Sequence, residues 1–188
     1  MKTKDLSKMY GFDQNHFDEY LRLSSFNFKS KLLGNEVSDE DVTTIVNAYK
    51  EYLANQDAEN LAKQQAVASM LITSGFSFEG YTIKKYSGYI SGDDAVEIPR
   101  ETQGFFGGRY NTAGDGLMAA LVEIRRNALG ELKEAAYALG CNAVIGVDFD
   151  YITLDPETAS STGGTLYLPY IIGVTANGNA VVIEKDAE

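Results

Sequence analysis

Apolar side chains recur every three or four positions over residues 115–139, the spacing that places them on one face of an α-helix. This stripe consists of Leu117, Leu121, Ile124, Ala128, Leu132, Ala135 and Leu139. Gly140 follows directly, and glycine is the residue that most readily takes the left-handed conformation of a helix C-cap. The pattern therefore predicts one long amphipathic helix that ends at Leu139 and is capped by Gly140.

A strand is predicted over residues 143–152, directly after this helix, because apolar and β-branched residues are dense there. Alternate residues of a strand face the same side at a spacing of about 6.5–7 Å. Asp148 and Asp150 therefore share one face, and the opposite face carries Val147, Phe149 and Tyr151.

The C-terminal part predicts two more short strands, near residues 170–175 and 180–184. Between them, residues 176–179 contain an Asn-Gly pair, which is a strong signal for a hairpin turn. Before the long helix, strands are expected at residues 71–73 and 81–91. The second of these has a bulge at Lys84 and Lys85, where its alternation slips. A glycine-containing loop is expected over residues 92–114.

The order strand, strand, helix, strand, hairpin predicts an α+β fold in two layers, an antiparallel sheet backed by one long helix. This domain is expected over residues 70–188. A sheet with one covering helix leaves its other face open, and oligomerisation is the usual way to bury such a face.

Residues 1–66 are predicted to form a helical N-terminal extension. A short helix is expected near residues 12–23, followed by a loop over residues 24–37 and a second helix capped by Ser38. The apolar stripe of this second helix needs a partner, which we expect from the C-terminal domain or from another subunit. The polar, Ala-rich residues 55–65 either continue the helix or form a linker.

The chain of 188 residues carries a net charge of -11, and its pI is near 4.5. An acidic surface repels phosphate groups, so we expect partners to include neither nucleic acid nor an anionic membrane. The N-terminus is not expected to be a signal peptide, because no apolar run follows its early lysines. A single cysteine excludes an intrachain disulfide, and a reducing, cytoplasmic setting is expected.

Asp148 and Asp150 are the first candidates for chemistry. Paired carboxylates can bind a hard divalent cation such as Ca²⁺, Mg²⁺ or Mn²⁺, and a symmetric ring would multiply the ligands. The alternative, which we favour, is that both aspartates face solvent or pair with Arg109, Arg125 or Arg126.

Cys141 is the only thiol and His16 the only histidine. A soft-metal site normally needs three or four such ligands, so one chain cannot build it. A ring could bring copies of Cys141 together around its axis. More often, a lone cysteine after a helix cap is a small buried hydrophobic residue.

Gly107, Gly108 and Arg109 lie in a glycine-containing loop ahead of the long helix, where backbone N–H groups can hold a phosphate or carboxylate. The loop matches neither the dinucleotide fingerprint nor the P-loop. We favour a structural role for it, with Phe105 and Phe106 at a subunit contact. No catalytic constellation is recognisable, and the chain is not expected to be an enzyme, although acid–base chemistry by Asp or Glu is left open.

Several motifs in the C-terminal domain occur in the order found in the YbjQ family, whose members are described as "putative heavy-metal-binding". They are EGY at 79–81, YSG at 86–88, FFGGR at 105–109, LGCNA at 139–143, IGVDFDY at 145–151 and AVVI at 180–183. The chain therefore resembles this family over residues 71–185. It departs from the family at Cys141, where many relatives have alanine, in a loop enlarged at 158–169, and in the N-terminal extension.

The resemblance implies a fold like a dodecin subunit and a ring-shaped assembly, with a pentamer or a multiple of it as the expected form. It implies no settled reaction and no established set of metal ligands. We therefore expect a cytoplasmic, ring-forming binding protein that takes a divalent metal ion or a small ligand at its subunit interfaces. An enzyme or sensor for a small anionic ligand that uses Arg109, and a purely structural scaffold, are the alternatives.

Overall fold

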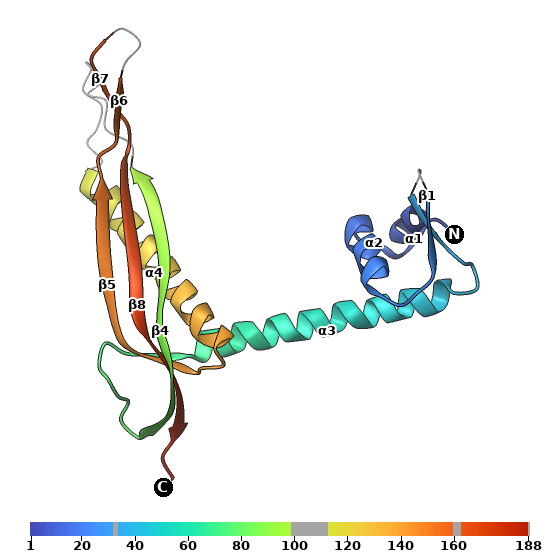
Figure 1. Cartoon of the computed structure of the whole chain (residues 1–188), viewed down its shortest axis with the longest axis horizontal. Helices are drawn as coiled ribbons and strands as arrows, with labels where there is room; N and C mark the ends of the chain where they lie inside the picture. Colours follow the sequence, from blue (N-terminus) through green and yellow to red (C-terminus); the bar gives the residue numbers. More distant parts are fainter. Residues whose placement is uncertain (32–33, 99–112, 160–162, 188) are drawn as a thin grey trace. The chain divides into compact units, whose positions relative to one another are not determined.

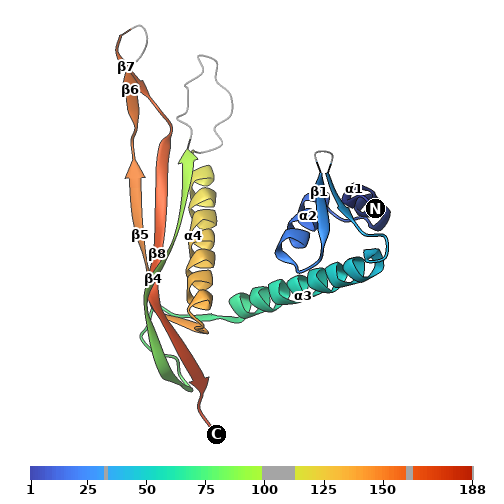
Figure 2. The same ribbon diagram turned by 45° about the vertical axis from the view of Figure 1, so that its right-hand side comes forward.

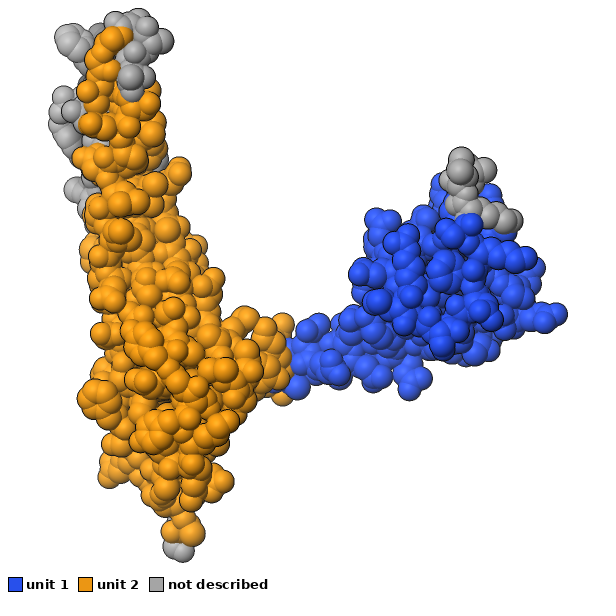
Figure 3. Space-filling view, in the orientation of Figure 1, with its two compact units in different colours: residues 1–62 blue, residues 63–188 orange. Residues whose placement is uncertain are grey.

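The computed structural model describes residues 1–31, 34–98, 113–159 and 163–187. The chain divides into two compact units, Met1–Ala62 and Lys63–Glu188, which are coloured separately in Figure 3. Among the described residues, none of the helices combines the length and the apolar character that a membrane span requires.

The N-terminal unit contains a helix-turn-helix connection followed by a β-hairpin (Figure 1). Helix α1 spans Thr3–Tyr10, helix α2 spans Gln14–Leu23, and residues 11–13 join them. Gly11 has the left-handed backbone of a C-cap (φ 73°), and the Asp13 side chain accepts a hydrogen bond of 2.8 Å from the backbone N–H of His16. Both turn residues therefore have the chemistry that stops one helix and starts the next.

Strands β1, Phe28–Lys31, and β2, Gly34–Val37, pair in antiparallel register within the segment predicted to be a loop. Helix α1 was also absent from the prediction. Residues of α1, α2 and β2 pack against the apolar stripe of α3, Val42–Ser69. The core of the unit contains Leu6, Phe17, Leu21, Val37, Ile45, Val46 and Tyr49. The expectation that this stripe needs the C-terminal domain or another subunit was therefore wrong.

Helix α3 begins at Val42, four residues after the predicted cap at Ser38. Residues 38–41 form a turn instead, in which the Asp41 N–H donates to the Ser38 carbonyl oxygen at 3.1 Å. The helix continues without interruption to Ser69, so the polar residues 55–65 are helical.

The C-terminal unit is an α+β domain in two layers, as predicted (Figures 1 and 2). Its sheet has the strand order β3-β5-β8-β4, formed by Leu71–Ile72, Ala143–Leu154, Tyr170–Lys185 and Tyr81–Ile98. Helix α4, Ala113–Ala138, covers one face of the sheet. The short β3 runs parallel to β5, whereas the other pairs are antiparallel, so the sheet is mixed.

Strand β8 is continuous through residues 176–179, where a hairpin turn was predicted. The turn would need positive φ at its two central residues, but neither Asn177 nor Gly178 has one. Asn177 pairs with Asp148 of β5 and with Ser91 of β4, whereas Gly178 pairs with Ile90 of β4 and falls at the register shift of the β5–β8 ladder. A side chain at Gly178 would lie 2.5 Å from Cγ1 of Val144, so the glycine serves close packing inside the sheet.

Strand β4 extends to Ile98, seven residues past the predicted end at residue 91. The predicted bulge is present as register shifts at Ile83/Lys85 and Tyr86/Gly88.

Residues 157–167 hold a further two-stranded antiparallel pair, β6 (Glu157–Ala159) and β7 (Thr165–Tyr167), within the loop expected to be enlarged. The predicted left-handed cap is confirmed, since Gly140 has a φ of 70°.

The two faces of the sheet have different cover. On the α4 side, the core contains Ile124, Ala128, Leu132, Ala136, Val144, Val174, Ala176 and Ala180. On the other face, which we call the open face, Phe78 and Tyr81 cover one end by packing on Ala143, Ile145, Val181 and Ile183. On the rest of the open face, the side chains of β4 and β5 are mostly exposed, whereas those of the central strand β8 are half-buried or buried, which determines where candidate sites can lie.

Candidate functional site

The open face carries a row of carboxylates at its centre. Asp148 and Asp150 are exposed there, while their neighbours Val147 and Phe149 pack against the α4-side core. The prediction that both aspartates lie on one face is therefore confirmed. Across the ladder, Asp150 is paired with Thr175, and Thr175 with Asp93 of β4.

Hydrogen bonds from β8 engage two of these carboxylates. The Asn177 Nδ2 donates to Asp150 Oδ2 at 2.8 Å, and the Thr175 hydroxyl donates to Asp93 Oδ1 at 2.5 Å. Asn177 is buried, at 5% exposure, because it lies on the central strand beneath its neighbours. The amide therefore fixes the orientation of the Asp150 carboxylate.

Pairing with the described arginines Arg125 and Arg126 does not account for the aspartates. The Arg125 guanidinium lies 5.2 Å from the centroid of the Tyr151 ring and donates to the Tyr151 hydroxyl. Arg126 is an exposed residue of α4, the helix on the other face of the sheet. Arg109, with Gly107 and Gly108, lies outside the described residues. Of the alternatives considered from sequence, exposure to solvent is the one that the described residues support.

The described residues of one chain do not present a complete cation site. In the described part of the chain, no group of three or more His, Cys, Asp or Glu side chains is close enough to hold a metal ion. Asp93 and Asp150 are separated by the whole width of β8, which corresponds to about 10 Å between their backbones. Oxygen ligands lie about 2.0–2.6 Å from Mg²⁺ or Ca²⁺, so their carboxylates cannot readily share an ion.

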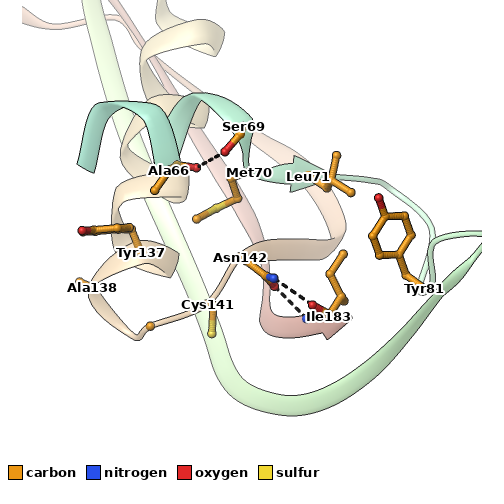
Figure 4. Close-up of a pocket in the computed structure, with 11 residues that line it drawn as sticks. Ala66, Ser69, Met70, Leu71, Tyr81, Tyr137, Ala138, Cys141, Asn142 and Ile183 are labelled. Atoms are coloured by element: carbon orange, nitrogen blue, oxygen red, sulfur yellow. Dashed lines mark hydrogen bonds between the residues drawn. The ribbon is translucent and has the colours of Figure 1, made fainter. Parts of the chain in front are cut away.

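A second candidate is a pocket of about 760 Å³ beside Cys141 (Figure 4). It lies in the C-terminal unit, where the last turn of α3, the end of α4 and the start of β5 meet. Side chains that line it include Met70, Tyr81, Tyr137, Cys141, Asn142 and Ile183. From sequence, only Cys141 of this set was a candidate for chemistry. Tyr81, Asn142 and Ile183 lie in three separate motifs, and no local pattern indicates that they come together.

Cys141 is 5% exposed, as a small buried hydrophobic residue would be. Its Sγ lies 3.9 Å from the carbonyl oxygen of Leu139. The other candidate for soft-metal ligation, His16, belongs to the N-terminal unit, where its Nδ1 lies 2.8 Å from the Tyr49 hydroxyl. Within the described residues of one chain, the thiol and the imidazole therefore do not form part of a soft-metal ligand set.

Asn142 closes one side of the pocket through two hydrogen bonds to one residue of β8. Its Nδ2 donates to the Ile183 carbonyl oxygen at 2.9 Å, and its Oδ1 accepts from the Ile183 N–H at 2.8 Å (Figure 4). The amide extends the β5–β8 ladder by one side-chain pair. Because both of its polar atoms are engaged, this amide is part of the wall of the pocket.

Comparison with known proteins identifies the domain. The model of the YbjQ family, described as "Putative heavy-metal-binding", matches residues 70–184, and the chain therefore belongs to this family. A UPF0145 protein of Clostridium kluyveri is 39% identical over 121 residues, which cover 61% of this chain and 100% of that protein. A UPF0145 protein of Acetivibrio thermocellus is 36% identical over 121 residues, which cover 61% of this chain and 100% of that protein.

Among solved structures, the chain matches a protein of unknown function from Pediococcus pentosaceus that belongs to the DUF74 family. Sequence identity is 16%, the TM-score is 0.38, and the match covers 61% of this chain and 98% of the other. The N-terminal unit lies ahead of the region that the family model matches.

Proposed function

We propose that this protein assembles into a ring of identical subunits, a pentamer or a multiple of it, and binds a divalent metal ion or a small ligand where subunits meet. Its expected setting is the cytoplasm. The observation that carries the proposal is the open face of the sheet, of which the described residues of one subunit cover only one end.

Large apolar side chains are exposed on this face. Tyr89, which pairs with Asn179, is 69% exposed, and Ile152, which pairs with Gly173, is 57% exposed. Burial of apolar area is worth roughly 25 cal/mol per Å², so a contact that covered these side chains would be favourable. Exposed large apolar side chains on one face favour contact with another protein.

Both long edges of the sheet support the same proposal. Strand β4 is the last strand at one side, and β3 covers only Ala143 and Val144 at the other. Within the described part of the chain, residues 148–154 of β5 therefore pair with β8 on one side and have no strand partner on the other. Free N–H and C=O groups at a strand edge readily pair with another chain, and a head-to-tail contact that closes gives a ring.

Metal binding would then be a property of the assembly. Asp148 and Asp150 provide two carboxylates on one strand, and because the described residues of one chain hold no group of three ligands, further ligands would come from another subunit. Oxygen ligands favour Mn²⁺, Mg²⁺ or Ca²⁺ over a thiophilic ion. The net charge of -11 raises the local concentration of any cation near the surface.

Native mass spectrometry tests the assembly, at micromolar protein over a range of salt. Ile152→Glu places a charge on the open face and is expected to shift the population towards monomer. Leu23→Glu is the matched control, because Leu23 is equally apolar and 78% exposed but lies in the N-terminal unit. A monomeric wild type, or equal assembly of Ile152→Glu and the control, contradicts the proposal.

Elemental analysis of protein purified without an affinity tag tests for a bound metal. Calorimetric titration with Mn²⁺, Mg²⁺ and Ca²⁺ then compares the wild type with Asp148→Asn/Asp150→Asn. The matched control is Asp57→Asn/Glu59→Gln, which removes the same charge from exposed positions of α3. Equal affinity in all three proteins removes these aspartates as ligands. An assembled protein that binds no metal and no small ligand would instead support the scaffold role.

A further inference from the structure

The pocket beside Cys141 has two walls of different origin. One wall belongs to the domain that the family model matches from residue 70 onwards, and it includes Met70, Cys141 and Ile183. The other wall is the last turn of α3, with Ala66 and Ser69, which precedes the matched region. The pocket is therefore completed by the helix that this chain adds to the domain.

We propose that this pocket binds a small, uncharged and largely apolar molecule, with one or two polar groups that reach tyrosine hydroxyls. Its volume of about 760 Å³ falls within the range of about 300–1,000 Å³ that is usual for small-molecule sites. The floor is apolar and well packed, since Met70 and Ile183 are each 5% exposed. Ala66 and Leu71 add further apolar surface at the sides.

The charge of the lining determines the ligand class. In the described residues, no Asp, Glu, Lys, Arg or His lines the pocket. An ion placed there would lose hydration without gaining a counter-charge, which is unfavourable. The pocket therefore differs in chemistry from the carboxylates of the open face and is suited to a neutral molecule.

Two hydroxyl groups are available to orient such a molecule. Those of Tyr81 and Tyr137 have no hydrogen-bond partner among the described residues. The other polar side chains are engaged, because the Asn142 amide is bonded twice to Ile183 and the Ser69 hydroxyl donates to the Ala66 carbonyl oxygen at 3.2 Å. A few available hydroxyls in an apolar recess are typical of sites that fix the orientation of a neutral ligand.

The bound molecule would also hold the end of α3 against the domain. Lys63 of α3 forms an ion pair with Glu134 of α4 at 2.7 Å, but both side chains are largely exposed. An exposed pair of this kind contributes little stability. A ligand that contacts Ala66 and Tyr137 together would add apolar contact between the same two helices, so hydrogen exchange of residues 63–70 is expected to slow when the pocket is filled.

Fluorescence titration of the full chain with N-phenyl-1-naphthylamine, a neutral apolar dye, tests the proposal. Ala66→Phe fills the pocket from α3 and is expected to weaken dye binding by tenfold or more. Ala58→Phe is the matched control, since Ala58 is a position of the same helix away from the pocket. Circular dichroism checks that both variants keep the helical content of the wild type.

The reactivity of Cys141 reports on the same pocket independently. Because this thiol lines the pocket and is the only one in the chain, saturating dye should slow its modification by a disulfide reagent several-fold. The anionic analogue 1-anilinonaphthalene-8-sulfonate should protect it less. Equal dye affinity in Ala66→Phe and wild type, unchanged thiol reactivity, or equal protection by the anionic dye each overturns the proposal.

Discussion

Gly92 of β4 lies directly against the backbone of Leu132 in α4. A Cβ at Gly92 would lie 2.4 Å from the Leu132 nitrogen and 2.4 Å from the Ala128 carbonyl oxygen. Both atoms belong to the helix backbone, which cannot rotate away as a side chain can. The absence of a side chain at this position therefore sets how closely α4 packs on the sheet.

Gly92→Ala is expected to destabilise the C-terminal unit, because the helix must shift to admit the methyl group. Overpacking of this kind costs about 1–3 kcal/mol of unfolding free energy. Gly130→Ala is the matched control: Gly130 lies within α4, and a Cβ added there would meet no atom within 4 Å. That change should stabilise by about 0.5–1 kcal/mol. Thermal unfolding at one fixed protein concentration measures both, and equal transition temperatures would contradict the packing argument.

Gly140→Ala tests the helix cap rather than the packing. Its φ of 70° is left-handed, and no atom lies within 4 Å of an added Cβ, so the whole cost comes from backbone conformation. We expect a loss on the order of 1 kcal/mol. Gly140→Asn should cost less, because asparagine tolerates this conformation better. The two transition temperatures decide the matter, and an unchanged value for alanine would contradict the role of the cap.

Local signals account for the parts of the fold that the sequence predicts well. The stripe of α4 and the glycine that ends it are both local, and the prediction of residues 115–139 differs by one or two residues from the observed Ala113–Ala138. Likewise, the period-two pattern of β5 places Asp148 and Asp150 on one face without knowledge of the neighbouring strands.

Tertiary contacts account for the parts of the structure that differ from the prediction. The Asn-Gly pair in β8 is a turn signal only when its residues can take positive φ. Here Asn177 pairs with strands on both sides and Gly178 pairs with β4, so the two residues continue an extended strand instead. Strands β1 and β2 contain mostly polar residues, so their pairing depends on contacts such as those of Val37 in the core. The pocket draws residues from positions 66 to 183, and no window of sequence contains its signal.

The stability of the N-terminal unit should fall at alkaline pH. Burial raises the pKa of Tyr49 above its ordinary value of 10.0, and the charge of Asp13 raises it further. Burial and the charge of Glu51 also raise the pKa of Tyr20. A group whose pKa is raised by folding contributes stability that is present below the unfolded pKa and is lost as pH rises through the folded pKa. Unfolding should therefore become easier above pH 10.

Tyr49→Phe removes one of these ionisations and should make the alkaline loss of stability shallower. At neutral pH the variant should be less stable, because His16 loses the hydroxyl that lies 2.8 Å from its Nδ1. Urea unfolding of the full chain at pH 8 to 11 measures both effects, with hydrogen exchange in residues 1–62 as the readout. Parallel pH profiles for wild type and variant would show that Tyr49 does not carry the effect.

The last prediction concerns the helix-turn-helix of the N-terminal unit. In DNA-binding proteins that contain this motif, the second helix enters the major groove, and basic residues around it contact phosphates. Here the surface of α2 includes Asn15, Glu19 and Arg22, and Asp18 lies on the same surface, where it accepts a hydrogen bond from Asn35. The acidic side chains are placed where a phosphate backbone would have to approach.

The charge of the whole unit supports the same conclusion. Residues 1–62 contain seven Lys and Arg residues against eleven Asp and Glu residues, a net charge of -4. We therefore expect no saturable binding of a random-sequence DNA duplex, even at about 50 mM salt, where electrostatic attraction is strongest among common conditions. Fluorescence anisotropy of a labelled duplex measures this, with the wild type beside Glu19→Lys. A saturable rise in the wild type that weakens with added salt would make the unit a DNA-binding module, whereas a rise in Glu19→Lys alone would show that acidic residues on α2 prevent binding.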